Sequence, residues 1–234
     1  MKSHLGQVLL AILFTCGSQL ASTQVPTDKQ PHASRPEEIE WTWEVRPAQA
    51  SPKLPNVLLL GDSITRNYFL QVTKDLEGVA NVYLMTSSTS VGDPRLASQI
   101  AEFAKLQGVR FAVVHSNNGM HGWGYTEAQF KVAFPSFLDA VDALPGHGKL
   151  IWSNITPVKP ECTTGATNPR IDSRNAIAEG LVSARKIPID DQHALMENHL
   201  DAFQDTVHFN KSGSAIMGDQ AAAIIKKALQ EVSH

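Results

Sequence analysis

From residue 56 to the end of the chain, short apolar runs alternate with longer segments of helical period. Five runs are apolar throughout, as strands buried on both faces are. They cover residues 56–60, 80–85, 109–114, 149–154 and 186–190. The helical segments lie near residues 66–77, 95–107, 126–143, 171–185 and 212–231. This alternation predicts an α/β protein with five parallel strands in a three-layer α/β/α sandwich.

The first 55 residues do not follow this pattern. Residues 1–22 combine Lys2, a short apolar core and small residues around Ala21, which is the pattern of a cleaved signal peptide. The apolar core is too short to span a bilayer, so we expect a secreted or periplasmic protein without stable membrane insertion. Cys16 leaves a lipidated N-terminus as an alternative.

Residues 23–55 are rich in Pro, Ser, Thr and Glu and predict a linker followed by an N-terminal arm. The stretch "IEWTWEV" in this arm alternates as a strand does, which places Trp41 and Trp43 on one face. We expect both rings to pack on the surface of the domain formed by residues 56–234.

The composition is that of an ordinary globular protein with one domain. The chain has 234 residues, of which 42% are hydrophobic and 18% charged, and its formal net charge is -3. Basic residues are not clustered, which argues against nucleic acid as a partner. Removal of the signal peptide leaves Cys162 as the single thiol, so the sequence predicts neither an internal disulfide nor a thiolate metal site. The composition does not indicate an oligomeric state.

Chemically reactive side chains follow the predicted strands. In a parallel sheet the strands end at one edge, where ligands bind. The loop after the first strand, "LLLGDSIT", carries Ser63, and the next two loops carry Gly92 in "TSSTSVGDP" and Asn118 in "HSNNGMHGW". The segment "QDTVHFNKSG" before the last helix carries Asp205 and His208. A serine, an amide and an Asp/His pair at one edge are the parts of a serine acyl-transfer site.

Ser63 on its own has two interpretations, because a serine at the start of a helix is either a nucleophile or an N-cap. His208 is a suitable base for a serine hydroxyl, since histidine side chains titrate near neutrality, and Asp205 is spaced to orient the imidazole ring. We therefore assign the chemistry to Ser63 and the cap to Asp62.

Taken in order, these motifs resemble the SGNH (GDSL-type) hydrolase family, whose members are esterases and lipases on a flavodoxin-like sandwich. The resemblance implies that Ser63 is the nucleophile, His208 the base and Asp205 the orienting carboxylate. It also implies three donors to the oxyanion of the tetrahedral intermediate. These are the backbone N–H of Ser63, the backbone N–H of Gly92 and the side-chain amide of Asn118.

The third motif departs from the common Gly-x-Asn-Asp pattern of the family. This chain has "SNNG" at residues 116–119, which is similar to a bacterial subgroup with an "NNGLH"-type third block. Asn117 is therefore an alternative to Asn118. In the second loop, the two residues before Gly92 are alternatives for the backbone donor.

We expect Asn117, His121 and Trp123 to line the substrate pocket. The aromatic face of Trp123 suits a sugar ring, and packing against the domain is an equal alternative. His115 and His121 have no third ligand nearby, so the sequence predicts no metal site. The resemblance implies no cofactor.

These features predict an exported serine esterase that hydrolyses carboxylic esters through an acyl-enzyme. The expected substrate is a small-molecule or polysaccharide ester with short acyl groups, such as acetyl groups, on carbohydrate. The chain has no "GxSxG" motif, which argues against the esterase fold with a nucleophile elbow. Two alternatives stay open: a lipolytic enzyme of lysophospholipase or thioesterase type, and a catalytically silent domain that binds glycans.

Overall fold

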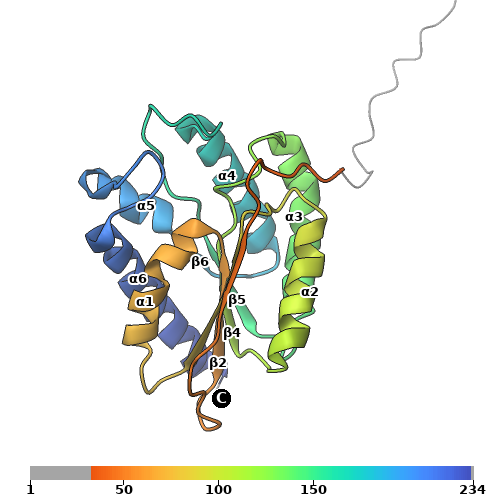
Figure 1. Cartoon of the computed structure of the whole chain (residues 1–234), viewed down its shortest axis with the longest axis vertical. Coiled ribbons are helices and arrows are strands. Elements are labelled where there is room, and N and C mark those ends of the chain that lie inside the picture. The colour runs from red at the N-terminus through yellow and green to blue at the C-terminus, as the bar shows by residue number, and fades with distance from the viewer. Residues whose placement is uncertain (1–32, 233–234) are drawn as a thin grey trace, which may run out of the picture.

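The computed structural model describes residues 33–232, and the predicted signal peptide at residues 1–22 lies outside them. A six-stranded sheet stands at the centre, with helices on both faces (Figure 1). The strands are β1 Thr42–Val45, β2 Asn56–Gly61, β3 Asn81–Ser87, β4 Val113–Ser116, β5 Lys149–Ser153 and β6 Ile189–Asp190. The helices are α1 Ser63–Asp75, α2 Arg95–Gln107, α3 Glu127–Asp142, α4 Asn168–Ala184, α5 Gln192–Glu197, the 3-10 helix Leu200–Ala202 and α6 Lys211–Val232.

The strand order across the sheet is β1-β3-β2-β4-β5-β6. Strands β2 to β6 are parallel, and their order is that of flavodoxin-like sheets, so the predicted three-layer sandwich is confirmed. All five predicted parallel strands are present, but the sheet has six strands, because residues 42–45 of the arm add β1, which pairs antiparallel with β3. An unpaired edge of β3 would expose a row of backbone hydrogen-bonding groups, and β1 covers that edge.

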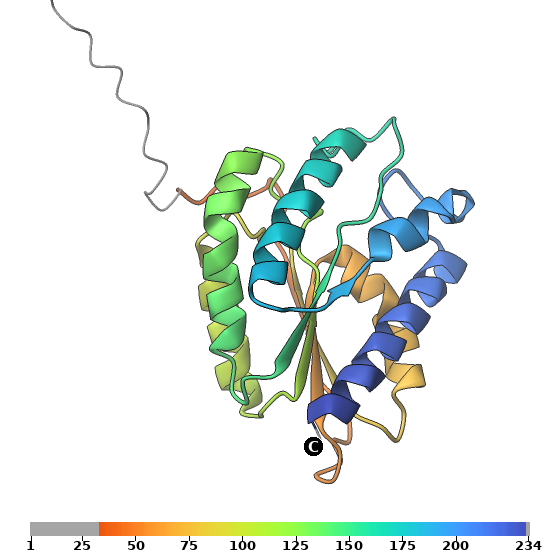
Figure 2. The same cartoon turned by 180° about the vertical axis from the view of Figure 1, so that it is seen from behind.

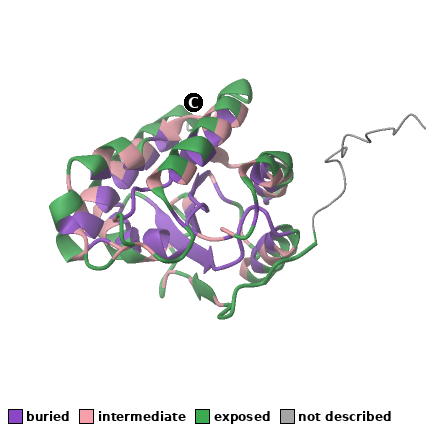
Figure 3. Cartoon of the chain, turned by 90° about the horizontal axis from the view of Figure 1, so that it is seen from above, coloured by how far each residue is buried: buried purple, intermediate pink, exposed green. Residues whose placement is uncertain are grey.

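Each face of the sheet has its own core. Helices α1, α5 and α6 cover one face, and α2, α3 and α4 cover the other (Figures 1 and 2). Alternate residues of β2 point to opposite sides. Val57 and Leu59 belong to the core beneath α1 and α6, whereas Leu58 and Leu60 belong to the core beneath α2 and α3. Figure 3 shows the buried strands enclosed by helices whose outer surfaces are exposed.

Several predicted elements are present with shifted boundaries. Helix α1 begins earlier than predicted, at Ser63, because the side chain of Asp62 caps it. Helix α4 also begins earlier, at Asn168, with a proline in its first turn, where the fixed φ of proline suits a helix. The strand predicted at residues 186–190 is reduced to Ile189–Asp190, since only these two residues pair with β5.

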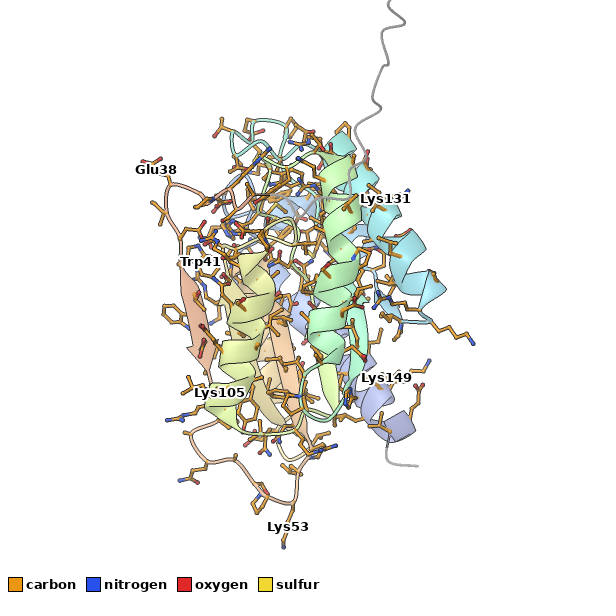
Figure 4. All side chains as sticks on the ribbon, turned by 90° about the vertical axis from the view of Figure 1, so that its right-hand side faces the viewer. Glu38, Trp41, Lys53, Lys105, Lys131 and Lys149 are labelled. Atoms are coloured by element: carbon orange, nitrogen blue, oxygen red, sulfur yellow. The ribbon has the colours of Figure 1, made fainter. Side chains whose placement is uncertain are left out.

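The arm runs along the outer edge of the sheet. Figure 4 shows Glu38 at one end of the molecule, Trp41 beside β1, and Lys53 in the turn at the opposite end. Trp41 and Trp43 share a face, as predicted, because the guanidinium of Arg66 on α1 lies 5.1 Å and 5.4 Å from their ring centroids. Trp41 is half-buried and Trp43 is exposed. The two rings therefore brace β1 against α1 at the surface.

The beginning of the arm is held by Asp93. Ser34 Oγ donates a hydrogen bond to Asp93 Oδ2 at 2.7 Å, and the backbone N–H of Arg35 donates to the same oxygen at 3.3 Å. Arg95 donates to both carboxylate oxygens, at 3.0 Å and 2.8 Å. Burial raises the pKa of Asp93, but the hydrogen bonds from Arg95 and Ser34 outweigh burial and lower the pKa to about 2.

We expect Asp93→Asn to reduce the free energy of unfolding by about 1 to 2 kcal/mol at neutral pH. The folded-state pKa of Asp93 is lower than its unfolded value, so this contribution is complete above about pH 4 and is lost as the pH falls through about 2. Urea unfolding from pH 7 to pH 2 should show the difference between the two proteins shrinking at the acid end. Asp142→Asn, at an exposed position, is the charge-matched control. A difference that stays constant with pH would contradict the prediction.

Candidate active site

Asp62 fixes the turn between β2 and α1. Its Oδ1 atom accepts a hydrogen bond from the backbone N–H of Ile64 at 3.0 Å, so Asp62 caps the helix, as predicted. Its Oδ2 atom accepts from the backbone N–H groups of Met120 at 3.1 Å and Gly119 at 3.4 Å. The carboxylate is fully buried. It therefore joins the turn that carries Ser63 to the loop after β4.

Gly61 allows these two segments to approach each other. A Cβ atom at this position would lie 2.4 Å from the carbonyl oxygen of Asn117 and 2.1 Å from Oγ1 of Thr65. Real Cβ atoms do not come this close to a backbone oxygen, so only glycine fits. In the "GDS" motif, Gly61 thus allows the close approach of the two segments, Asp62 caps the helix and Ser63 follows as its first residue.

The side chains of Ser63, His208 and Asp205 form a chain of hydrogen bonds. His208 Nε2 lies 2.7 Å from Ser63 Oγ, and His208 Nδ1 lies 2.9 Å from Asp205 Oδ2. The fold brings Ser63 and His208 together although they are 145 positions apart in the sequence. Because Asp62 makes the cap contact, the Ser63 hydroxyl is available to His208.

The loop from Phe203 to Phe209 holds the Asp/His pair in place. The ends of this loop form an antiparallel bridge, and the two phenyl rings stack with their centroids 4.4 Å apart. Asp205 Oδ1 accepts hydrogen bonds from the backbone N–H groups of Val207 at 2.8 Å and His208 at 2.7 Å. Burial raises the pKa of Asp205, but these hydrogen bonds and the His208 ring lower it overall. The carboxylate is therefore ionised at neutral pH and oriented toward the imidazole.

Asn118 joins the loops that follow β3 and β4. Its Nδ2 donates to the carbonyl oxygen of Thr89 at 3.0 Å, and its Oδ1 accepts from the backbone N–H of Val91 at 2.9 Å. This leaves one of its two amide hydrogens for another acceptor. The amide of Asn117 instead donates to two carbonyl groups at the end of β5, both at 3.1 Å. Of the two asparagines, Asn118 is thus the one with an amide hydrogen that no described residue binds.

The loop after β3 has two backbone N–H groups without an acceptor. The N–H of Val91 is occupied, whereas those of Ser90 and Gly92 make no hydrogen bond within residues 33–232. The N–H of Ser63, in the first turn of α1, is also without an acceptor in this range. Val91 is therefore excluded as the backbone donor to an oxyanion, and Gly92 and Ser90 stay as alternatives for that donor. Gly92 packs against Tyr125, whose ring leaves no room for a Cβ atom.

A cavity of about 690 Å³ opens beside Ser63 and His208. Its walls come from the arm and from the loops after β4 and β5, with the lining residues 35–38, His121, Trp123, Thr164 and Gly165. The structure thus places two of the three predicted pocket residues, His121 and Trp123, on the wall. Asn117, the third, is buried and is not among the residues that line the cavity.

The arm contributes an acidic side chain whose role was not predicted from the sequence. Glu37 Oε2 lies 2.9 Å from His121 Nδ1, and Glu37 Oε1 accepts from the backbone N–H of Gly122 at 3.1 Å. Burial lowers the pKa of His121, but the hydrogen bond to Glu37 and the charges of Asp62, Glu37 and Glu40 raise it overall. Nothing in the acidic stretch "PEEIE" predicts that Glu37 contacts a residue 84 positions away.

Arg174 of α4 supports the loop after β4 from within the protein. It donates to the carbonyl oxygens of His121 at 3.2 Å and of Gly122 and Tyr125 at 3.0 Å. Its guanidinium also lies 4.0 Å from the centroid of the Trp123 ring, so part of this indole is used in packing. Burial lowers the pKa of Arg174 to about 10, and the side chain stays charged at neutral pH.

His115, the other histidine near this loop, lies in the core and not at the cavity. Its Nε2 is 2.7 Å from Asp190 Oδ2, and both side chains are buried. Among residues 33–232, no three His, Cys, Asp or Glu side chains are grouped as metal ligands. In the same part of the chain, no helix has the length and apolar character needed to cross a membrane.

No protein-family model matches the sequence, and no curated protein matches it significantly. Solved structures match it by fold, and they define a class of fold found in lipolytic proteins and esterases. A member of the lipolytic protein G-D-S-L family from Veillonella parvula has a TM-score of 0.59 at 17% identity, with 73% of this chain and 97% of that chain covered. The similarity shows that the two chains share a fold.

Two further solved structures extend this likeness. A carbohydrate esterase family 3 protein from Talaromyces cellulolyticus has a TM-score of 0.59 at 17% identity, covering 76% of this chain and 99% of that chain. The C-terminal catalytic domain of peptidoglycan O-acetyltransferase A from Streptococcus pneumoniae has a TM-score of 0.55 at 16% identity, covering 77% and 95%. The fold implied by the SGNH resemblance is therefore confirmed.

We expect Asp62→Asn to lower the free energy of unfolding by about 1 to 3 kcal/mol. Asparagine caps a helix about as well as aspartate, so the contact with Ile64 is retained. The new amide group, however, would turn donors toward the N–H of Met120 and leave that N–H unsatisfied. Urea unfolding measures the change.

The matched control is Asp191→Asn, because Asp191 caps α5 at an exposed position. Asparagine there should cost less than about 0.5 kcal/mol. Equal losses in the two variants would show that the contact between Asp62 and the loop after β4 contributes nothing to stability.

Proposed function

We propose that the protein is a serine esterase of the SGNH type that hydrolyses carboxylic esters. The observation that carries this proposal is the chain of contacts from Asp205 through His208 to Ser63, at 2.9 Å and 2.7 Å, beside an open cavity. This order of groups suits a serine nucleophile with a histidine base. Solved proteins of the same fold include a lipolytic protein and a carbohydrate esterase, which supports the same class of reaction.

In the proposed reaction, His208 Nε2 takes the proton of the Ser63 hydroxyl while Ser63 Oγ bonds to the acyl carbon of the ester. The proton then passes to the oxygen of the departing alcohol as its bond to the acyl carbon breaks. Water attacks the acyl-serine by the same route, so the acid leaves and Ser63 regains its proton. Asp205 accepts the Nδ1–H of His208 throughout and stabilises the imidazolium.

Three donors are available for the negative charge that develops on the acyl oxygen. They are the N–H of Ser63, the free amide hydrogen of Asn118 and the N–H of Gly92, for which Ser90 is the alternative. The N-terminus of α1 adds a favourable field at the same place. Such preorganised donors are commonly the largest contribution to acyl transfer.

We further propose that the natural substrate carries short acyl groups, such as acetyl groups, on carbohydrate. Arg35, Glu37 and Glu38 line the side of the cavity that the arm forms, and these charged groups suit a hydroxyl-rich alcohol, whereas the other walls include the apolar side chains of Met120, Trp123 and Val207. The signal peptide predicted at residues 1–22 supports a secreted or periplasmic location, where polysaccharide esters occur. A lysophospholipase or thioesterase on the same machinery is the alternative.

The identity of the nucleophile is testable with a serine-directed fluorophosphonate. We expect this reagent to label the protein, and Ser63→Ala to abolish labelling and reduce turnover of 4-nitrophenyl acetate by about a thousandfold or more. Intact mass measurement and absorbance assays give the two readouts. Ser173→Ala, at an exposed position on α4, is the control and should behave as the wild type. A wild-type protein that neither labels nor turns over the ester would favour the catalytically silent, glycan-binding alternative.

The acyl group is testable with a series of 4-nitrophenyl esters. We expect kcat/KM to be highest for the acetate and to fall by about tenfold or more at the octanoate, because a long acyl chain would displace water from the charged groups of Arg35, Glu37 and Glu38 in the cavity wall. Ser63→Ala supplies the background rate for each ester. A profile that rises with chain length would instead favour the lipolytic alternative.

A further inference from the structure

Two tryptophans of the arm lie at the surface beside α1. Trp43 is 52% exposed, although tryptophan side chains are highly buried on average. Trp41, two positions earlier on the same face of the arm, is half-buried, and the guanidinium of Arg66 lies over both rings. The exposed fraction of Trp43 already takes Arg66 into account, so a ligand reaches this indole without any movement of Arg66. We call these three side chains the tryptophan platform.

The tryptophan platform also offers hydrogen-bond donors. The Arg66 guanidinium has no hydrogen-bond or ion-pair partner among residues 33–232, and the indole N–H groups of Trp41 and Trp43 have no acceptor there. A flat apolar ring beside free N–H donors matches a sugar, which has an apolar face of C–H groups and a rim of hydroxyl groups. Exposed apolar patches with a polar rim are typical of binding sites.

The tryptophan platform adjoins the cavity beside Ser63. The ring of Trp41 meets the imidazole of His121 edge to face, with the centroids 5.8 Å apart, and His121 lines the cavity. Glu38 lines the cavity too, and the arm continues from there past Trp41 along β1 (Figure 4). Trp43 lies two positions beyond Trp41, which is about 7 Å in an extended chain. A ligand that occupies both the cavity and Trp43 is therefore longer than one sugar ring.

We infer that the tryptophan platform binds a neutral polysaccharide, whose linked sugar rings lead from Trp43 to the acylated sugar in the cavity. This inference rests on the proposed function and specifies its substrate as a polymer. Stacking on Trp43 and hydrogen bonds from Arg66 hold the chain, and the reaction at Ser63 is the one already described. Trp43 and Arg66 thus determine specificity at a distance from the ester.

The charges near the tryptophan platform favour a neutral chain over an anionic one. Arg66 provides a positive charge at the platform, and Arg35 provides one at the cavity. The carboxylates of Glu37 and Glu38 line the same cavity, however, and they repel an anionic polymer. A fatty chain also fits poorly, because it would cover the unpaired donors of Arg66 without satisfying them.

The experiment compares polymeric and monomeric esters of the same sugar. Acetylated xylan and acetylated glucomannan, both neutral, are paired with the monoacetates of methyl xyloside and methyl mannoside, and released acetate is the readout. We expect the wild type to prefer at least one polymer by about tenfold or more in kcat/KM per acetyl group, the scale of one well-placed tryptophan contact. A wild type that labels with the fluorophosphonate but prefers neither polymer would overturn this inference and leave the esterase proposal standing.

Trp43→Ala should reduce the polymer preference to less than about threefold, because the stacking surface is lost. The preference is a ratio within one protein, so a general loss of activity cancels. Trp43→Tyr keeps an aromatic ring and should retain most of the preference. Leu106→Ala, which removes an exposed apolar side chain from α2, is the control and should keep the wild-type preference. If Trp43→Ala keeps the wild-type preference, the inference is overturned.

The role of Arg66 has its own pair of variants. Arg66→Met keeps an apolar chain but loses the donors, so its preference should lie between those of the wild type and Trp43→Ala. Lys74→Met makes the same change of charge at an exposed position on α1 and should keep the wild-type preference. Equal preferences in the two methionine variants would overturn the role of Arg66.

Sedimentation velocity distinguishes a polysaccharide from a second copy of this chain as the occupant of the tryptophan platform. We expect the wild type and Trp43→Ala to sediment alike at the same concentration. A wild-type dimer that Trp43→Ala dissociates would identify the platform as an interface between copies and overturn this inference. If the wild type neither labels nor releases acetate from any of the esters, both this inference and the esterase proposal are overturned.

Discussion

Three backbone N–H groups from two separate segments meet on the buried carboxylate of Asp62. One belongs to the first turn of α1, and the other two belong to the loop after β4. This single side chain therefore sets the distance between the serine and the loop that carries Asn118 and His121. It also removes the need for Ser63 to cap its own helix, and the hydroxyl is left for His208.

The loop after β4 depends on buried polar contacts from several sides. Asp62 binds its backbone N–H groups, Arg174 binds its carbonyl oxygens, and Glu37 binds it from the arm. Asn118 extends the same system to the loop after β3. Most backbone groups of these loops therefore have hydrogen-bond partners, in contrast to the N–H groups of Ser63, Ser90 and Gly92. The hydrogen bonds to the backbone groups of these loops therefore set the geometry of the site. The parallel strands supply the common edge from which the loops begin.

The parts of the site that could be predicted from the sequence are those whose position follows from the sheet. Ser63 and His208 lie at the edge where the strands end, and the three-residue spacing of Asp205 from His208 is local. The resemblance favoured Asn118 and left Asn117 as an alternative, because neighbouring asparagines look alike until their hydrogen bonds are known. The contact between Glu37 and His121 could not be predicted from the sequence, for a different reason. This contact depends on the arm folding back over the cavity. The periodicity of the arm predicts a strand, but it does not show that this strand pairs with β3 at the edge of the sheet.

The arm joins the domain through one short edge strand and a few side-chain contacts, yet its residues form a wall of the cavity. No residue of this arm is among the fully buried residues of the two cores or in the Ser63–His208–Asp205 chain, and Val45 packs against one core from its side. The parts of the chain that would perform the chemistry and the part that would choose the alcohol are thus physically separate. A change in residues 33–45 can alter what the cavity accepts and leave the reacting groups in place. This gives selection, or an engineer, a short segment through which one hydrolytic scaffold is adapted to different esters.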